Sequence, residues 1–222
     1  MSTLSNVNSR VGGPRPTCAT PPFGTLPEAI SQKGVSVRYA PSPDKSWYVF
    51  RASYGREHKA ANVMIEDGTY AYVACRYVKR RMGGKFRLKL ESLVPNLVFA
   101  YTSADQANQY VRHTPSLSYL EFYYDHLSQN ADGFNPPLIV PDHEMTNFIL
   151  ATYSHNEHVM MVTPVQCHFK SGDHVRVTEG AFCGVEGLVA RVAGQQRVVI
   201  TLTGLGLIST AYIPTAFLEN ID

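Results

Sequence analysis

The sequence predicts an α+β protein with two small domains: an antiparallel split-βαβ sheet with helices on one side, followed by a small β-barrel. Two observations support this. Between residues 45 and 153, strand-like and helix-like segments follow in the order βα-ββ-αβ-α, and from residue 165 to residue 222 short valine-rich strands alternate with glycines. The length of 222 residues suits two such domains preceded by a tail.

Residues 1–44 are expected to form a disordered tail. This segment holds seven of the 14 prolines and few large apolar residues. It therefore cannot bury enough apolar surface to offset the entropy of ordering it. At most, one short ordered piece is expected around Leu26–Ile30.

Residues 45–153 are expected to form the first domain. Aromatic and β-branched runs predict its strands, and apolar residues at helical spacing predict its helices. Ser103 is the expected N-cap of the second helix, and Pro115 lies just beyond the end of that helix. The predicted strands cover 46–52, 70–78, 86–90, 93–101 and 117–124, and the predicted helices cover 56–66, 104–112 and a segment that starts at 141.

A basic hairpin is predicted within this domain, with its turn at Gly83–Gly84. The returning strand from Phe86 to Leu90 alternates strictly, which gives it one basic face. Seven cations follow one another here without an acid between them: Arg76, Lys79, Arg80, Arg81, Lys85, Arg87 and Lys89. Such a surface can bind nucleic-acid phosphates, or it can be a solvated face that deters edge pairing.

Residues 154–164 are expected to be a linker, and residues 165–222 the second domain. Four short strands are predicted in the second domain, at 174–177, 187–192, 197–202 and 211–214. Their regular spacing and the glycines between them are typical of a small barrel.

Composition excludes several classes of protein. A net charge of +2 excludes a polycation that coats nucleic acid, and the four cysteines form no CxxC pair, so neither a disulfide scaffold nor a structural zinc site is expected. We expect no signal peptide, no membrane helix and no cofactor, and hence a cytoplasmic protein. No phosphate-binding or nucleophile motif is present, and no base is expected beside Cys75 or Cys183, so an enzyme is not expected.

Residues 172–189, GDHVRVTEGAFCGVEGLV, closely resemble a KOW motif. Gly180 and Gly184 are expected to turn the loop at positive φ, and Gly187 to permit close backbone approach. Phe182, between them, is either a core residue or an exposed contact.

The first domain resembles the NusG N-terminal (NGN) domain. Residues 47–61, WYVFRASYGREHKAA, are similar to its opening strand and helix, while Gly83–Lys85 and 93–101, LVPNLVFAY, are similar to its hairpin and following strand. Residues 140–145, VPDHEM, are similar to the start of its closing helix. Over residues 45–222, therefore, the chain resembles NusG-family transcription factors, which implies a ferredoxin-like NGN sheet followed by an SH3-like KOW barrel. The Pro95–Asn96 pair and the long tail resemble specialised paralogs of the UpxY and RfaH types.

The resemblance implies a non-enzymatic monomer that binds the RNA polymerase clamp and promotes processive elongation or antitermination at specific operons, such as those for polysaccharide synthesis. The residues implied for the polymerase contact are Tyr54, Pro95, Leu97 and Phe99. Those for upstream or non-template DNA are Arg56, His58, Lys59, Lys79, Arg80, Arg81 and Lys85. Gly180, Phe182 and Gly184 are implied to bind a ribosomal protein or the termination factor Rho. The alternative is a ribosome-associated, RNA-binding KOW protein.

Overall fold

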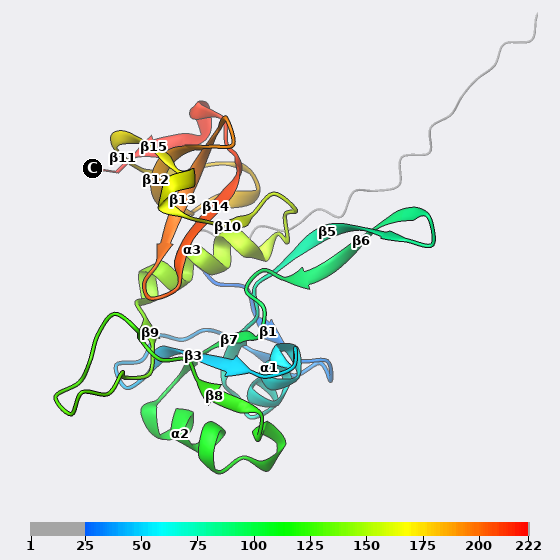
Figure 1. Ribbon diagram of the computed structural model, residues 1–222, viewed down its shortest axis with the longest axis vertical. Helices are drawn as coiled ribbons and strands as arrows, with labels where there is room; N and C mark the ends of the chain where they lie inside the picture. Colours follow the sequence, from blue (N-terminus) through cyan, green and yellow to red (C-terminus); the bar gives the residue numbers. More distant parts are fainter. Residues whose placement is uncertain (1–24, 222) are drawn as a thin grey trace, which may run out of the picture.

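The structure is a computed structural model that describes residues 25–221, except for the side chains of residues 170–173, so the first 24 residues of the expected tail lie outside the described part. The chain has the α+β architecture that the sequence predicts. Figure 1 shows an N-terminal sheet below and a C-terminal sheet above, with helix α3 (Asp142–Tyr153) between them and a two-stranded arm at one side. None of the helices in residues 25–221 is long and apolar enough to cross a membrane.

Residues 25–44 are more ordered than their composition predicts. Strand β1 (Ala29–Ile30) pairs antiparallel with β2 (Ser36–Val37). The Tyr39 ring stacks on that of Trp47, with 5.7 Å between their centroids, and its hydroxyl donates to Asp142. Because a few aromatic contacts bury much apolar surface, this segment packs on the first domain despite its prolines.

The N-terminal sheet has the antiparallel pairing expected of this domain. Its strands follow the order β4-β7-β3-β8, and β9 also pairs with β3. The strands are β3 (Ser46–Ala52), β4 (Tyr70–Tyr72), β7 (Leu97–Thr102), β8 (Leu120–Phe122) and β9 (Ile139–Val140). All six residues of β7 are buried, as in a central strand covered on both faces.

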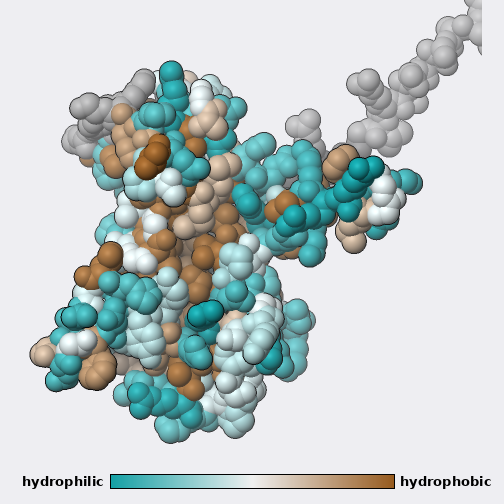
Figure 2. All heavy atoms as spheres, viewed as in Figure 1, coloured by the Kyte–Doolittle hydropathy of each residue, from teal (hydrophilic) through white to brown (hydrophobic). Residues whose placement is uncertain are grey.

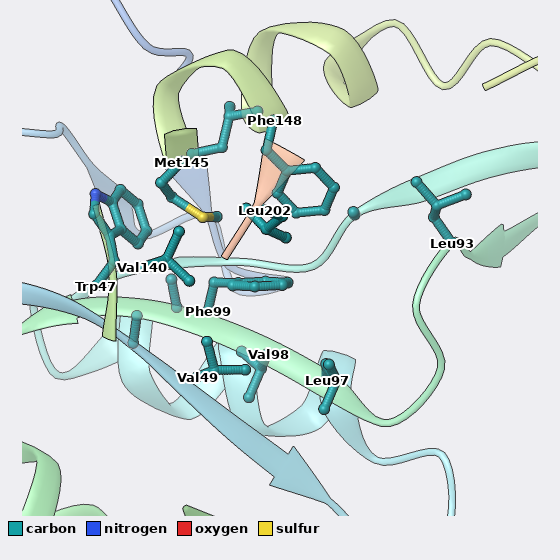
Figure 3. Close-up of a cluster of buried hydrophobic side chains, with 14 of the residues drawn as sticks. Trp47, Val49, Leu93, Leu97, Val98, Phe99, Val140, Met145, Phe148 and Leu202 are labelled. Atoms are coloured by element: carbon teal, nitrogen blue, oxygen red, sulfur yellow. The ribbon is translucent and has the colours of Figure 1, made fainter. Parts of the chain in front are cut away.

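The sequence predicts that the helices lie on one side of this sheet. That prediction is wrong, because helices cover both sides. Figures 1 and 3 show α1 (Glu57–Glu66) on the side away from α3. Helix α3 instead covers the side that carries Phe99, whose ring centroid lies 5.2 Å from that of Phe148. Helix α3 is apolar enough to be buried on more than one side, and a helical period alone does not show which face of a sheet a helix will cover.

Helix α2 (Ala104–Arg112) begins as predicted, because the Ser103 side chain accepts a hydrogen bond from Gln106 N at 3.3 Å. We expect Ser103→Ala to lower the free energy of unfolding by about 1 kcal/mol, since one N-terminal amide of the helix then lacks its acceptor. Chemical denaturation measures this change. Ser103→Asp restores an acceptor and is expected to keep the stability of the parent; a loss as large as that of the alanine variant would contradict this assignment.

The arm consists of β5 (Cys75–Met82) and β6 (Lys85–Ser92), joined at Gly83 and Gly84, which both have positive φ. The two strands form a sheet of their own, and Figure 1 shows them projecting from the rest of the molecule. The single strand predicted over 70–78 is therefore two strands, because β4 ends in the N-terminal sheet and β5 starts the arm.

The C-terminal sheet has six antiparallel strands in the order β10-β14-β13-β12-β11-β15. They are β10 (Met160–Val162), β11 (His168–Val177), β12 (Glu186–Val192), β13 (Gln195–Leu202), β14 (Gly206–Tyr212) and β15 (Leu218–Asn220). Strand β10 falls within the expected linker, so only the first part of that segment connects the two sheets. The close approach predicted at Gly187 is confirmed: a Cβ there would lie 2.5 Å from the Val199 carbonyl oxygen.

The two sheets share one hydrophobic core, with α3 between them. Figure 3 shows Leu202 of the C-terminal sheet beside Met145 and Phe148, over Phe99 of the N-terminal sheet. Polar contacts border this core: the backbone and hydroxyl of Thr203 donate to the Glu144 carboxylate at 2.6 and 2.7 Å. Both sheets therefore hold α3 in place.

Candidate functional site

Two loops meet at one end of β3 and β7 and place Tyr54 and Pro95 on the surface. Asn96 joins them, because its carbonyl accepts from Ala52 N at 2.7 Å and its side-chain oxygen accepts from Gly55 N at 2.9 Å. Tyr54 and Asn96 both have positive φ, of 63° and 65°. A glycine at 96 could adopt this backbone but could not accept from Gly55, so asparagine here fixes the loop that carries Tyr54.

Tyr54 is 87% exposed and borders a group of cations. The Arg56 guanidinium carbon lies 5.3 Å from the centroid of the Tyr54 ring and 4.7 Å from that of Tyr119, and Lys59 Nζ lies 5.8 Å from the Tyr119 centroid. These are cation–π distances, and they hold the planar guanidinium against aromatic faces. We call Tyr54, Arg56, Lys59 and Tyr119 the Tyr54 cluster.

Tyr119 is the member of this cluster that sequence reasoning missed. It is buried, burial raises its pKa, and its hydroxyl has no hydrogen-bond partner within residues 25–221. The sequence placed Tyr119 only in an aromatic strand. No local pattern shows that the residue lies against Arg56, because the contact joins segments more than sixty residues apart in the sequence.

Leu97 and Phe99, also predicted for the polymerase contact, do not reach the surface. Leu97 is buried, and Phe99 is 1% exposed beneath Phe148. Of the four residues predicted for this contact, the structure therefore brings Tyr54 and Pro95 together at the surface. Contact through Phe99 itself would require α3 to move.

The prediction that no base lies beside Cys75 is wrong. His58 Nε2 lies 3.7 Å from Cys75 Sγ and 3.4 Å from Ser92 Oγ, which itself donates to Glu57. However, burial, together with the negative charge of Glu57, raises the pKa of the Cys75 thiol to about 11. At neutral pH this thiol is protonated, so the pair lacks the thiolate that nucleophilic chemistry requires.

The arm presents its cations to solvent, and some of them pair with acidic side chains. The Arg80 guanidinium makes two hydrogen bonds with the Glu91 carboxylate, at 3.0 and 2.7 Å, and Lys79 Nζ lies 3.2 Å from Glu157. Arg81 and Lys85 are exposed nearer the turn. All four side chains remain exposed, so these cations are accessible to an anionic ligand.

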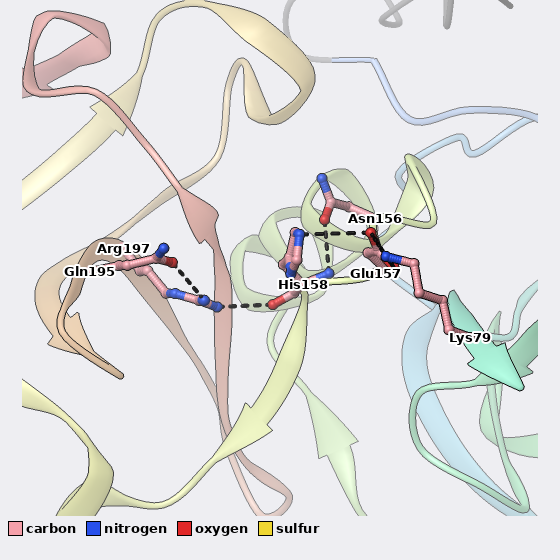
Figure 4. A network of polar contacts seen from close by, with 6 residues as sticks. All are labelled: Lys79, Asn156, Glu157, His158, Gln195 and Arg197. Carbon is pink, nitrogen blue, oxygen red and sulfur yellow. Dashed lines mark hydrogen bonds and ion pairs between the residues drawn. The ribbon is translucent and has the colours of Figure 1, made fainter. Parts of the chain in front are cut away.

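The segment between α3 and β10 is fixed from both sides. Tyr77 N in the arm donates to the His155 carbonyl, and on the other side Arg197 of β13 donates to the His158 carbonyl at 2.9 Å. Figure 4 shows Lys79, Glu157, His158 and Arg197 in one polar network. The arm and the C-terminal sheet are thus connected through a few residues.

The glycine loop predicted to bind a partner lies against α3. Gly180 and Gly184 have φ of 82° and 87°, as predicted, and a Cβ on Gly184 would lie 3.6 Å from Leu150 of α3. Phe182 is buried, so the interpretation as a core residue is the one that the structure supports. Its role in partner binding stays a prediction. Among the side chains that the structure describes, no group of three or more histidine, cysteine or acidic residues could hold a metal ion.

Comparison with known proteins identifies the first domain. Residues 45–149 match the sequence model of a family described as transcription termination factor NusG, and no curated protein matches the chain. The matched range includes the N-terminal sheet, the arm and the Tyr54 cluster, and it ends within α3. Residues 45–149 are therefore a NusG domain, which supports membership of the chain in the NusG family of transcription factors.

Proposed function

We propose that this protein is a transcription elongation factor that binds the clamp of RNA polymerase and promotes processive elongation or antitermination. The observation that carries the proposal is the match of residues 45–149 to NusG, since this range includes every residue of the Tyr54 cluster. No covalent chemistry is required. A binding preference of about 1.4 kcal/mol for the closed clamp changes its equilibrium tenfold.

The Tyr54 cluster, with Pro95 and Asn96 beside it, has the properties of a protein-binding site. Tyrosine and arginine are enriched among the residues that carry most of the binding energy at interfaces, and here they are adjacent. Arg56 is already held against two aromatic rings, and Asn96 already fixes the Tyr54 loop, so little conformational entropy is lost on binding. Pro95 adds a rigid apolar neighbour.

The cations extend this interface toward nucleic acid. Arg56 and Lys59 lie in the Tyr54 cluster, and the exposed His58 lies on the same helix, facing the base of the arm. Together with Lys79, Arg80, Arg81 and Lys85 of the arm, they would contact upstream or non-template DNA through its phosphates. In this proposal the C-terminal sheet is a KOW domain that binds a ribosomal protein or Rho through the loop that Gly180 and Gly184 shape over the buried Phe182. Restriction to particular operons comes from the DNA contacts.

We expect Tyr54→Ala to weaken binding to purified bacterial core RNA polymerase about tenfold, because an exposed aromatic anchor is removed. Biolayer interferometry with the full chain measures the dissociation constant. Tyr212→Ala is the matched control, since Tyr212 is also exposed but lies on β14, outside the NusG domain. Equal affinity of the Tyr54→Ala variant and the parent would contradict the assignment, as would an equal loss in both variants.

The proposed activity is tested by transcription in vitro on a template with a terminator. The protein should raise the fraction of polymerases that read through, in proportion to its occupancy of the polymerase. Co-sedimentation with ribosomes, without polymerase binding, would overturn the proposal in favour of a ribosome-associated protein.

A further inference from the structure

The arm has two chemically different sides. Directly paired residues of antiparallel strands point to the same side, so the strand register assigns each side chain. The register pairs Tyr77 with Leu90, Lys79 with Leu88 and Arg81 with Phe86 on one side, and Val78 with Lys89, Arg80 with Arg87 and Met82 with Lys85 on the other. We call the first the apolar side, after Tyr77, Phe86, Leu88 and Leu90, and the second the basic side, after Arg80, Lys85, Arg87 and Lys89.

The apolar side is open to solvent. Phe86 is 75% exposed and Leu88 is 60% exposed, and none of the four apolar residues belongs to a buried cluster of the described chain. Figure 2 shows brown apolar atoms on the arm among hydrophilic ones. A strand that alternates strictly between apolar and charged residues is the pattern of a half-buried strand, yet nothing in residues 25–221 buries it.

The arm packs few of its apolar side chains against the rest of the described chain. An isolated two-stranded hairpin gains little stability in water, and its exposed apolar residues favour association with other surfaces. Phe86, Leu88 and Leu90 lie on the same side of β6 and together span about 14 Å, which is the size of a small docking surface.

We propose that the apolar side of the arm docks on a protein surface of RNA polymerase that is apolar at its centre and acidic at its edge, while the basic side faces nucleic acid. This inference rests on the proposed function and assigns a second polymerase contact, separate from the Tyr54 cluster. Lys79 and Arg81 lie on the apolar side and flank its leucines and Phe86, so a complementary partner carries acidic groups around an apolar patch.

Charge and side-chain chemistry argue against two other ligands for the apolar side, a second copy of this chain and nucleic acid. The arm carries seven cations and one acid, Glu91, so two arms would repel each other and a second copy of this chain is disfavoured. Nucleic acid is a poor ligand for Leu88 and Leu90, because aliphatic side chains neither stack well on bases nor pair with phosphates. The basic side offers phosphates a better surface on the same ribbon.

The assignment is tested by photocrosslinking in a complex of core polymerase with a template and non-template scaffold. The full chain carries a benzophenone amino acid either at Phe86, on the apolar side, or at Arg87, on the basic side. We expect position 86 to crosslink to a polymerase subunit and position 87 to crosslink to DNA. These neighbours differ by one residue and point to opposite sides, so each serves as the control for the other.

Affinity measurements provide a second test. The double variant Phe86→Ser/Leu88→Ser should weaken polymerase binding about tenfold and leave binding to free single-stranded DNA unchanged. The matched pair from the same strand, Arg87→Ser/Lys89→Ser, should weaken DNA binding and leave binding to DNA-free polymerase unchanged. Thermal unfolding should not change in either variant, since the outer arm lies apart from the shared core.

The outcomes separate the two proposals. If polymerase binds in a Tyr54-dependent way but position 86 crosslinks to DNA, to a second copy, to the chain itself or to nothing, the docking inference is overturned and the proposed function stands. If the parent protein does not bind polymerase, the proposed function is overturned and this inference with it.

Discussion

Replacing Phe148 with alanine should lower the free energy of unfolding by about 3–5 kcal/mol, the range for truncating a fully buried phenylalanine. Phe148 is completely buried, and its ring lies 5.2 Å from that of Phe99 and 6.2 Å from that of Tyr72. The change removes these aromatic contacts and leaves a cavity that neighbouring rings cannot easily fill. Because α3 packs between both sheets, the cavity affects the core that they share.

Denaturant unfolding can follow this variant with a local probe. Trp47 is the only tryptophan and is buried in the same core, so its fluorescence reports on the N-terminal sheet, while far-ultraviolet circular dichroism reports on the whole chain. We expect the two transitions to coincide, as one shared core requires. His143→Ala, at an exposed position of α3, is the control and should change stability by less than about 0.5 kcal/mol. A loss below about 1 kcal/mol for Phe148→Ala would contradict the packing described here.

Local patterns predicted much of the fold. Strict alternation from Phe86 to Leu90 identified a hairpin strand with two different sides, and Ser103 was recognised as a helix N-cap from its residue type and position. The turn glycines of the C-terminal sheet were predicted because positive φ is a local requirement. Such signals are readable because the physical constraint involves residues near one another in the sequence.

Contacts between distant segments were not predicted. Strand β10 lies in the segment that was expected to be a linker. It was not predicted as a strand because its pairing with β14 joins residues nearly fifty positions apart. Likewise, periodicity showed that α3 is apolar but did not show that it covers Phe99. The resemblance to NusG, by contrast, assigned Phe99 to a surface contact, although β7 is a central strand that is buried on both sides.

The candidate site shows the same division. The sequence indicated the arm cations through residue type and the turn glycines beside them, and the resemblance to NusG implied Tyr54. It could not indicate Tyr119 beside Arg56, His58 beside Cys75 or Glu157 beside Lys79, because each pair forms only when the chain folds. The resemblance to NusG supplied the role of the surface, whereas the structure supplied its geometry.

Arg197 is a buried cation of the C-terminal sheet, and its replacement should have the second-largest effect on stability. It is 5% exposed, and its guanidinium donates to the carbonyls of His158 and Thr210, both at 2.9 Å, and to the Gln195 side chain at 3.0 Å. Burial lowers its pKa, but arginine remains protonated at neutral pH. The hydrogen bonds must therefore offset the cost of burying a charge.

We expect Arg197→Met to lower the free energy of unfolding by about 2–3 kcal/mol, because two carbonyls lose charged donors in the interior. The loss is smaller than the sum of the broken hydrogen bonds, since a buried charge is removed at the same time. Arg191→Met on the neighbouring strand β12 is the matched control: Arg191 is exposed, so its replacement should change stability by less than about 0.5 kcal/mol.

The same variant tests whether Arg197 holds the segment between α3 and β10. The His158 carbonyl belongs to that segment, so Arg197→Met should speed amide hydrogen exchange across residues 155–160, whereas exchange in the outer arm should stay the same. Arg197→Lys should fall between the parent and the methionine variant, because one ammonium group can reach one carbonyl but cannot bridge both. Unchanged stability together with unchanged exchange in the methionine variant would mean that the desolvation cost of the guanidinium cancels its hydrogen bonds, and that the segment is held from the side of the arm alone.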